Sequence, residues 1–128
     1  MRKEVVNIIQ EFEDQDSVLF ARLDEATWTL VPKMNGCPLV FQDMGDAVAI
    51  RTGFNVEVSV DYQEEDSSQI IYEIILSLMN GDSIELFSGV YRNRLASCGY
   101  EVEFPSGSMK ELGEGRKVFT VRLPRWNK

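Results

Sequence analysis

Residues 55–80, NVEVSVDYQEEDSSQIIYEIILSLMN, contain a strand pattern followed directly by a helix pattern. From Asn55 to Gln63 apolar and polar side chains alternate, which is typical of a strand with one buried face. From about 67 to 80 apolar side chains occupy most of the helix circumference, which predicts a central helix packed on a sheet. Its polar positions form only a narrow stripe of Gln69, Glu73, Ser77 and Asn80.

The ends of this helix are marked by local signals. Asp66 and Gln69 have the spacing of a capping box, and the acids just before them suit the positive end of the helix dipole. Asn80-Gly81 is typical of a helix C-terminus, because glycine adopts the left-handed conformation there without strain.

Outward from this stretch, residues 2–13 carry one apolar stripe and predict a surface helix. Short β-prone runs account for most of the remaining chain. They are residues 18–23, 27–31, 39–44, 47–52, 83–90, 100–104 and 118–123. Gly45-Asp46 predicts a tight hairpin turn, and residues 105–115 predict a long hairpin loop. We therefore expect an α+β fold: a mainly antiparallel sheet of about 6–8 short strands, an N-terminal helix and one central buried helix.

The chain of 128 residues, with 44% apolar and 27% charged residues, predicts one domain covering residues 1–128. Acidic residues interrupt the first sixteen positions, which argues against a secretion signal, and no apolar run is long enough to span a bilayer. Cys37 and Cys98 belong to no paired motif, so we expect two thiols in a reducing cytoplasm, with a disulfide as the alternative.

Charge is unevenly distributed along the chain. The net charge is −8, and residues 1–66 hold 14 acids and 5 bases, whereas residues 67–128 hold 7 acids and 8 bases. The bases near the C-terminus are Arg116, Lys117, Arg122, Arg125 and Lys128. An overall negative field disfavours nucleic acid and anionic membranes and favours a basic protein partner, although the charge can also serve solubility alone.

Histidine is absent from the sequence. This removes the usual general base near neutral pH and every Ser-His or Cys-His nucleophile. The loop at 106–117 lacks the Gly-Lys-Ser/Thr pattern of a phosphate-binding loop. We therefore predict no catalytic residues, no metal site and no cofactor.

Carboxylate chemistry needs no histidine, so one enzymatic alternative stays open. Asp61, Glu64, Glu65 and Asp66 form the densest acidic cluster. They could support a carboxylate-dependent or metal-assisted enzyme. The simpler interpretation is a solvated loop that precedes a helix.

Outward-facing strand positions supply a candidate partner surface. Glu57 and Asp61 on one strand, with Glu101 and Glu103 on another, would form a negative stripe if the strands share a solvent face. Such positions are often charged for solubility alone, and Arg122 opposite one of these acids would instead make an internal pair. Together with the loop acids, the predicted partner-binding residues are Glu57, Asp61, Glu64, Glu65, Glu101 and Glu103.

Aromatic side chains add little to this surface. We expect Trp28, Phe41, Phe54, Phe87 and Phe119 in or beside the core. Trp126 lies beyond the last strand, where it either folds back over the core or forms an exposed binding contact.

A small acidic domain without catalytic motifs is similar, by class alone, to the immunity proteins with which bacteria neutralise basic toxin domains. The leading hypothesis is thus a non-enzymatic inhibitor of a basic partner, present as a monomer or homodimer. A secretion chaperone or adaptor is the second alternative, for which dimerisation would be the distinguishing property.

Overall fold

The computed structural model describes residues 2–23, 26–90, 94–112 and 117–126, which form two helices and nine strands. In chain order these are α1 (Lys3–Glu13), β1 (Val18–Leu23), β2 (Thr27–Pro32), β3 (Leu39–Asp43), β4 (Ala47–Thr52), β5 (Val56–Asp61), α2 (Ser67–Asn80), β6 (Ser83–Val90), β7 (Arg94–Phe104), β8 (Gly107–Leu112) and β9 (Lys117–Arg122). The fold is α+β, as the sequence predicts. Arg116 and Lys128, two of the C-terminal bases, lie outside the described residues.

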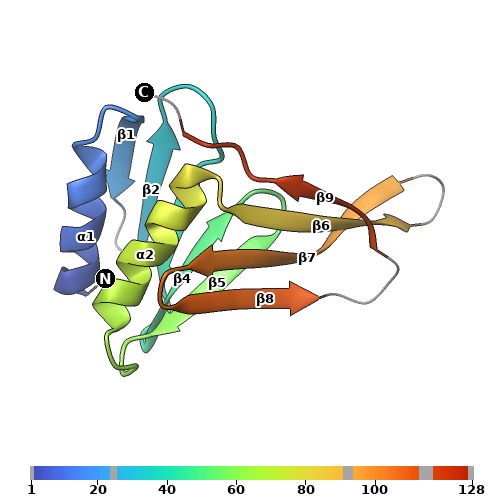
Figure 1. Ribbon diagram of the computed structural model, residues 1–128. Coiled ribbons are helices and arrows are strands. Elements are labelled where there is room, and N and C mark those ends of the chain that lie inside the picture. The colour runs from blue at the N-terminus through green and yellow to red at the C-terminus, as the bar shows by residue number, and fades with distance from the viewer. Residues whose placement is uncertain (1, 24–25, 91–93, 113–116, 127–128) are drawn as a thin grey trace.

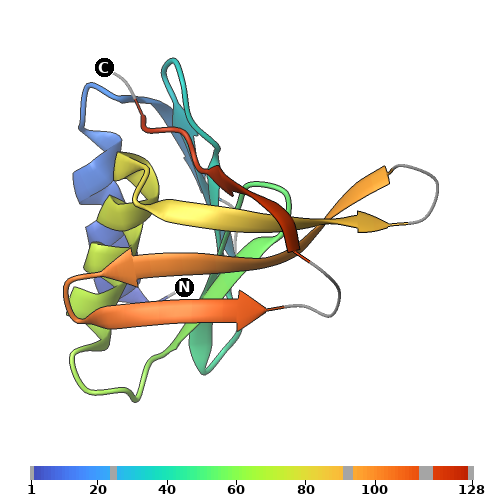
Figure 2. The same cartoon turned by 45° about the vertical axis from the view of Figure 1, so that its right-hand side comes forward.

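The strands form two antiparallel sheets. The first is a five-stranded meander in the order β1-β2-β3-β4-β5, and the second has four strands in the order β8-β7-β6-β9. Both helices lie against one face of the first sheet. The second sheet begins on the side of α2 that is away from α1 and extends outward from there (Figures 1 and 2). The expected 6–8 strands are therefore nine, divided between two sheets.

The core lies between the helices and the first sheet. On β5 the burial alternates strictly, with Val56, Val58 and Val60 buried and the residues between them exposed. The ring of Phe12 on α1 meets that of Tyr72 on α2 at 5.2 Å between centroids. The second sheet joins the same core through Tyr100 and Val102. Burial of each large apolar side chain contributes about 1.5–3 kcal/mol.

The bounds of α2 match the prediction, but its N-terminal cap does not. Asp66 adopts a left-handed conformation with φ of 60° and makes no side-chain capping hydrogen bond. Backbone carbonyls instead accept the first donors, because the Ser67 N–H bonds to the Glu64 carbonyl at 3.1 Å. At the other end Gly81, with φ of 75°, ends the helix as expected.

The second sheet covers only the middle of the predicted polar stripe on α2. Gln69 and Asn80 are exposed, whereas Glu73 and Ser77 are buried. Glu73 accepts hydrogen bonds from the backbone N–H and the hydroxyl of Ser106, and Ser77 donates to a backbone carbonyl of β7. These two polar positions therefore hold the end of the β7–β8 hairpin against the helix.

The prediction of a long loop at 105–115 is wrong. Phe104 pairs with Gly107 across a tight turn, and β8 then runs beside β7. The GSMKEL sequence of β8 has weak strand propensity, and its residues are almost all exposed. Pairing with β7 imposes the strand conformation, since an edge strand needs only one partner and tolerates polar side chains.

The Gly45-Asp46 turn between β3 and β4 is confirmed: Gly45 has φ of 92°, and the Met44 N–H bonds to the Ala47 carbonyl. Neither helix in the described part of the chain is long and apolar enough to cross a membrane.

The C-terminal segment folds back over the core. Trp126 is only 6% exposed, and its backbone N–H bonds to the Met79 carbonyl at 2.8 Å. Its indole packs so closely on Gly36 that a Cβ there would lie 2.4 Å from the ring. Trp126 is therefore a buried residue that packs against the core, and it is not an exposed binding contact.

Candidate binding surface

One end of the molecule gathers acidic side chains from two separate chain segments. The turn between β3 and β4 and the loop between β5 and α2 are joined by Tyr62. Its backbone N–H bonds to the Asp46 carbonyl at 2.9 Å, and its hydroxyl donates to Asp43 Oδ1 at 2.9 Å. We call the exposed carboxylates of this region the acidic end; they are Asp46, Asp61, Glu64, Glu65 and Asp66.

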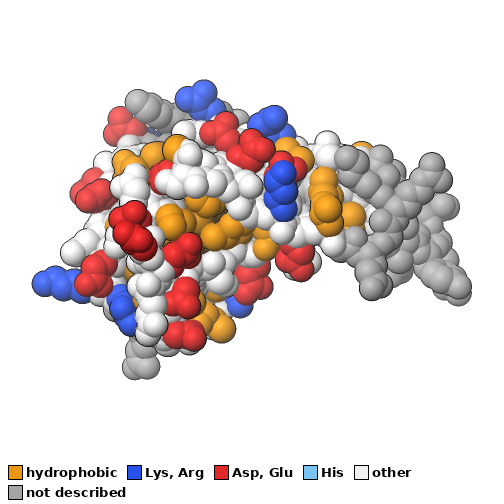
Figure 3. All heavy atoms as spheres, turned by 60° about the horizontal axis from the view of Figure 1, so that its bottom comes forward, with side chains coloured by type: hydrophobic (Ala, Val, Ile, Leu, Met, Phe, Trp, Pro, Cys, Tyr) orange, Lys and Arg blue, Asp and Glu red, His pale blue; other side chains and the backbone are white. Residues whose placement is uncertain are grey.

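The partners of Asp43 set the local electrostatics beside the acidic end. Hydrogen bonds from the Gly45 N–H and the Tyr62 hydroxyl lower the pKa of the Asp43 carboxyl. Burial and the neighbouring Asp43 raise the pKa of the Tyr62 phenol. The guanidinium of Arg2 lies 4.3 Å from the centre of the Tyr62 ring, so one cation is held beside this region. On the face in Figure 3, acidic side chains are widespread and outnumber basic ones.

The other predicted partner-binding residues lie elsewhere. Glu57 is at the opposite end of β5 and pairs with Arg51 at 3.3 Å. Glu101 and Glu103 are on β7, in the second sheet, where Glu101 pairs with Lys110 at 3.2 Å. Because β5 and β7 belong to different sheets, the four strand acids do not form a stripe on one sheet face.

Arg122 does not make the predicted pair with one of these acids. It lies opposite Ile84 in the β6–β9 register, and its guanidinium donates to the Gly81 carbonyl at 2.9 Å. The contact fixes the side chain against the end of α2.

The carboxylates of the loop between β5 and α2 do not converge on a metal position. Asp61, Glu64, Glu65 and Asp66 are all exposed, and Asp61 accepts the Gln63 N–H at 2.8 Å. Among the described residues, no three His, Cys, Asp or Glu side chains are close enough together to hold a metal ion. The arrangement gives no support to the enzymatic alternative.

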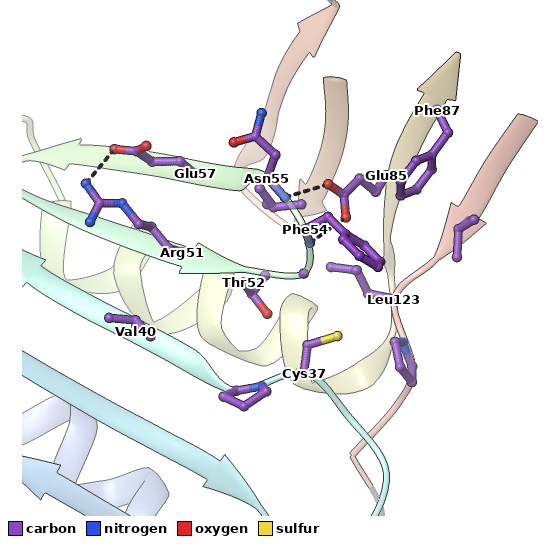
Figure 4. A pocket seen from close by; sticks show the side chains of 15 residues that line it. Cys37, Val40, Arg51, Thr52, Phe54, Asn55, Glu57, Glu85, Phe87 and Leu123 are labelled. Carbon is purple, nitrogen blue, oxygen red and sulfur yellow. Dashed lines mark hydrogen bonds and ion pairs between the residues drawn. The ribbon is translucent and has the colours of Figure 1, made fainter. Parts of the chain in front are cut away.

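A pocket of about 750 Å³ lies at the other end of β5. It is formed where the turn between β4 and β5 meets the second sheet and the C-terminal segment. Most of its lining is apolar, from Pro38, Val40, Phe87, Val121 and Leu123. Figure 4 shows Phe54 beside Phe87 on one side of the pocket, with Arg51 and Glu57 on the other. Its volume falls within the range of sites that bind small molecules.

Glu85 fixes the turn that forms one wall of this pocket. The side chain is 1% exposed and accepts hydrogen bonds from the Phe54 and Asn55 N–H groups at 3.0 and 2.7 Å. A third bond comes from the Ser97 hydroxyl at 2.6 Å. Gly53, with φ of 61°, allows this approach, because a Cβ there would lie 2.7 Å from the carboxylate. One buried carboxylate thus fastens the first sheet to the second.

Phe54 is the most exposed large apolar residue among those described. It lies at the tip of the turn held by Glu85 and is 86% exposed. Its ring meets Phe87 edge-on at 5.6 Å, and Phe87 stacks on Phe119 at 5.4 Å. Of the five aromatic residues expected in or beside the core, Trp28, Phe41 and Phe87 are buried, whereas Phe54 projects into solvent and Phe119 is 38% exposed.

The thiols of Cys37 and Cys98 are both free and partly buried. Cys37 lines the pocket, where burial raises the pKa of its thiol despite an opposing hydrogen bond from the Gly53 backbone. The thiol is consequently protonated at neutral pH and is a poor nucleophile.

Sequence reasoning did not find the pocket or its buried carboxylate. In β6 the apolar residues Ile84 and Leu86 suggest that Glu85 faces solvent. One contrary signal exists, because Glu85 shares its strand face with Phe87. Because the two residues are two positions apart, the strand places the Glu85 carboxylate on the same face as an aromatic ring. This spacing does not reveal that the turn between β4 and β5 supplies hydrogen-bond donors to the carboxylate.

The chain matches no protein-family model, no curated protein and no solved structure. The candidate binding surface is therefore defined only by the residues and contacts of this chain.

Proposed function

We propose that this protein is a non-enzymatic binding protein that inhibits a basic protein partner, in the manner of bacterial immunity proteins. The observation that carries the proposal is the acidic end. Residues 43–66 contain seven acids and a single base, Arg51, and the fold brings two of their loops together through Tyr62. Arg51 pairs with Glu57, away from that cluster.

Electrostatics supplies the mechanism. Concentrated exposed carboxylates attract a cationic protein and orient it before contact, which raises the association rate more than the final affinity. If the cationic surface of the partner surrounds its active site, the same contact blocks the substrate of that partner. Asp61, Glu64 and Glu65 are the three predicted residues that lie in the acidic end.

The proposal also assigns the chain to a bacterial cytoplasm. A reducing compartment keeps Cys37 and Cys98 as the free thiols that the structure contains. Glu57, Glu101 and Glu103 remain proposed contacts, with smaller expected contributions, because Glu57 and Glu101 already have a cationic neighbour.

Affinity capture from the native cell lysate tests the proposal. We expect one stoichiometric basic protein at low salt and its loss at about 0.5 M salt, where the Debye length falls to about 4 Å. Co-expression with the captured protein should relieve its toxicity. A partner that is acidic, or one whose capture is unchanged by salt, would contradict the proposal.

A further inference from the structure

The exposed Phe54 is held in a fixed position. Two consecutive backbone N–H groups of its turn, those of Phe54 and Asn55, bond to the buried Glu85 carboxylate. The edge-on contact with Phe87, which in turn stacks on Phe119, supports the ring from one side. A rigid exposed aromatic loses little conformational entropy on binding, which is a property of interface hot spots.

The pocket beside Phe54 is suited to a side chain of a partner. Val40, Val121 and Leu123 give it apolar walls. Its rim carries Glu57 and Arg51, whose side chains are 48% and 43% exposed and pair with each other at 3.3 Å. An apolar group entering the pocket therefore passes this ion pair, and a cationic neighbour of that group can compete with Arg51 for the carboxylate.

The outward positions of β5 connect this pocket to the acidic end. Glu57, Ser59 and Asp61 are exposed at alternate positions along the strand, and β5 is an edge strand of the first sheet. Asp61 follows Glu57 by four residue steps of extended chain, a span of about 13 Å. One partner surface can therefore contact the pocket and the acidic end together.

We propose that the pocket beside Phe54 binds an apolar side chain that the basic partner presents within its cationic surface. This inference rests on the proposed function and specifies the chemistry of the partner: an aromatic or aliphatic anchor with basic residues next to it. Charge complementarity favours this occupant over a second copy of the chain, because each copy carries a net charge of −8 and two copies repel each other. The acidic end governs association, and the Phe54 pocket governs dissociation.

Two synthetic peptides test the apolar contact directly. One is Lys-Lys-Phe-Lys-Lys, and the other replaces its phenylalanine with serine. NMR titration should show the phenylalanine peptide binding about tenfold more tightly, the ratio expected for about 1.4 kcal/mol of apolar burial. Only that peptide should shift the amide signals of Cys37, Gly53 and Asn55.

Two variants locate the effect. Phe54→Ala should remove the difference between the peptides, and Val121→Asn should reduce it, because Val121 on β9 lines the same pocket. Leu112→Ala is the matched control, because Leu112 is 77% exposed but lies on β8, outside the pocket. The control should keep the tenfold ratio. Urea unfolding of each variant shows whether the fold is retained.

The outcomes separate this inference from the proposed function. Salt-dependent binding of both peptides with equal affinity would keep the acidic contact and overturn the pocket assignment. A Phe54→Ala variant that still prefers the phenylalanine peptide would overturn it as well. Binding that does not respond to salt would contradict the proposed function. If light scattering shows a dimer that Phe54→Ala dissociates, a second copy occupies the pocket and the assignment is wrong.

Discussion

The two ends of β5 use carboxylates in opposite ways. At the pocket end, Glu85 is buried and accepts hydrogen bonds from three neutral donors of the protein. At the acidic end, Asp61, Glu64 and Glu65 are exposed. The first arrangement stabilises the fold, because buried donors and acceptors satisfy one another. The second adds mutual repulsion and contributes little to folding, and it is the part of the molecule to which the proposed function assigns binding.

This difference predicts which measurement each acidic residue affects. Substituting a carboxylate that accepts hydrogen bonds from distant segments should lower the free energy of unfolding. Substituting an exposed carboxylate among like charges should instead slow association with a partner. Glu73 belongs with Glu85 in this respect, since it joins α2 to the turn between β7 and β8.

The largest expected effect is on Glu85. Glu85→Ala removes the shared acceptor of three donors that joins the two sheets, and we expect a loss of about 3 kcal/mol in the free energy of unfolding. Glu85→Gln should lose about half as much, because the amide keeps one acceptor oxygen. Urea unfolding measures both. Glu57→Ala is the control and should change stability by less than about 0.5 kcal/mol; an equal loss in Glu57→Ala and Glu85→Ala would remove the distinction between the two ends.

A smaller effect is expected for Glu73. Glu73→Ala removes the acceptor of the Ser106 N–H and hydroxyl, but Ser106 is exposed, so water can replace the carboxylate. We expect a loss of about 1 kcal/mol in the free energy of unfolding. In this variant, hydrogen exchange should accelerate more at the amides of β8 than at those of the first sheet, relative to the parent. Unchanged protection in β8 would contradict the role of Glu73 in holding the hairpin.

The smallest effect concerns pH and Asp43. Its carboxyl has a lowered pKa in the folded protein, so its stabilising contribution is present above the ordinary value of 3.8 and is lost as the pH falls through the lowered one. Asp43→Asn should therefore be less stable than the parent at about pH 6, and the gap should be smaller at about pH 3, below the ordinary value of 3.8. Thermal unfolding at the two pH values measures it. A gap of the same size at both would show that the contribution comes from shape and not from charge.

Sequence patterns predicted the parts of the fold that depend on local chemistry. The period of the apolar residues located α2 at 67–80, and glycine located the turn at Gly45. Patterns failed where a distant segment decides the outcome. β8 became a strand only by pairing with β7, and Phe54 reads as a core aromatic although its turn projects it into solvent.

The candidate site was predicted in part for the same reason. Asp61, Glu64 and Glu65 are close in sequence, so their clustering followed from the chain itself. Their approach to Asp46 follows from the pairing of β4 with β5, in which Ala47 lies opposite Asp61, and the hydrogen bonds of Tyr62 extend it. The strands divide into two sheets, and this separates Glu57 from Glu101. The division depends on which distant strands pair, so local sequence patterns could not predict it either.

The association rate of the captured basic partner with two charge-matched variants tests the central claim. The acidic-end variant combines Asp61→Asn, Glu64→Gln and Glu65→Gln. The helix variant combines substitutions of the same types at three exposed residues in and just after the end of α1, at the opposite side of the molecule in Figure 1: Glu11→Gln, Glu13→Gln and Asp14→Asn.

Both variants lose three negative charges, so net charge alone would slow them equally. By stopped flow at about 0.05 M salt, we expect the acidic-end variant to associate about tenfold more slowly than the parent and the helix variant to stay close to it. The difference should vanish at about 0.5 M salt. Equal slowing of the two variants, or a parent rate that does not change with salt, would contradict the assignment of the acidic end as the binding surface.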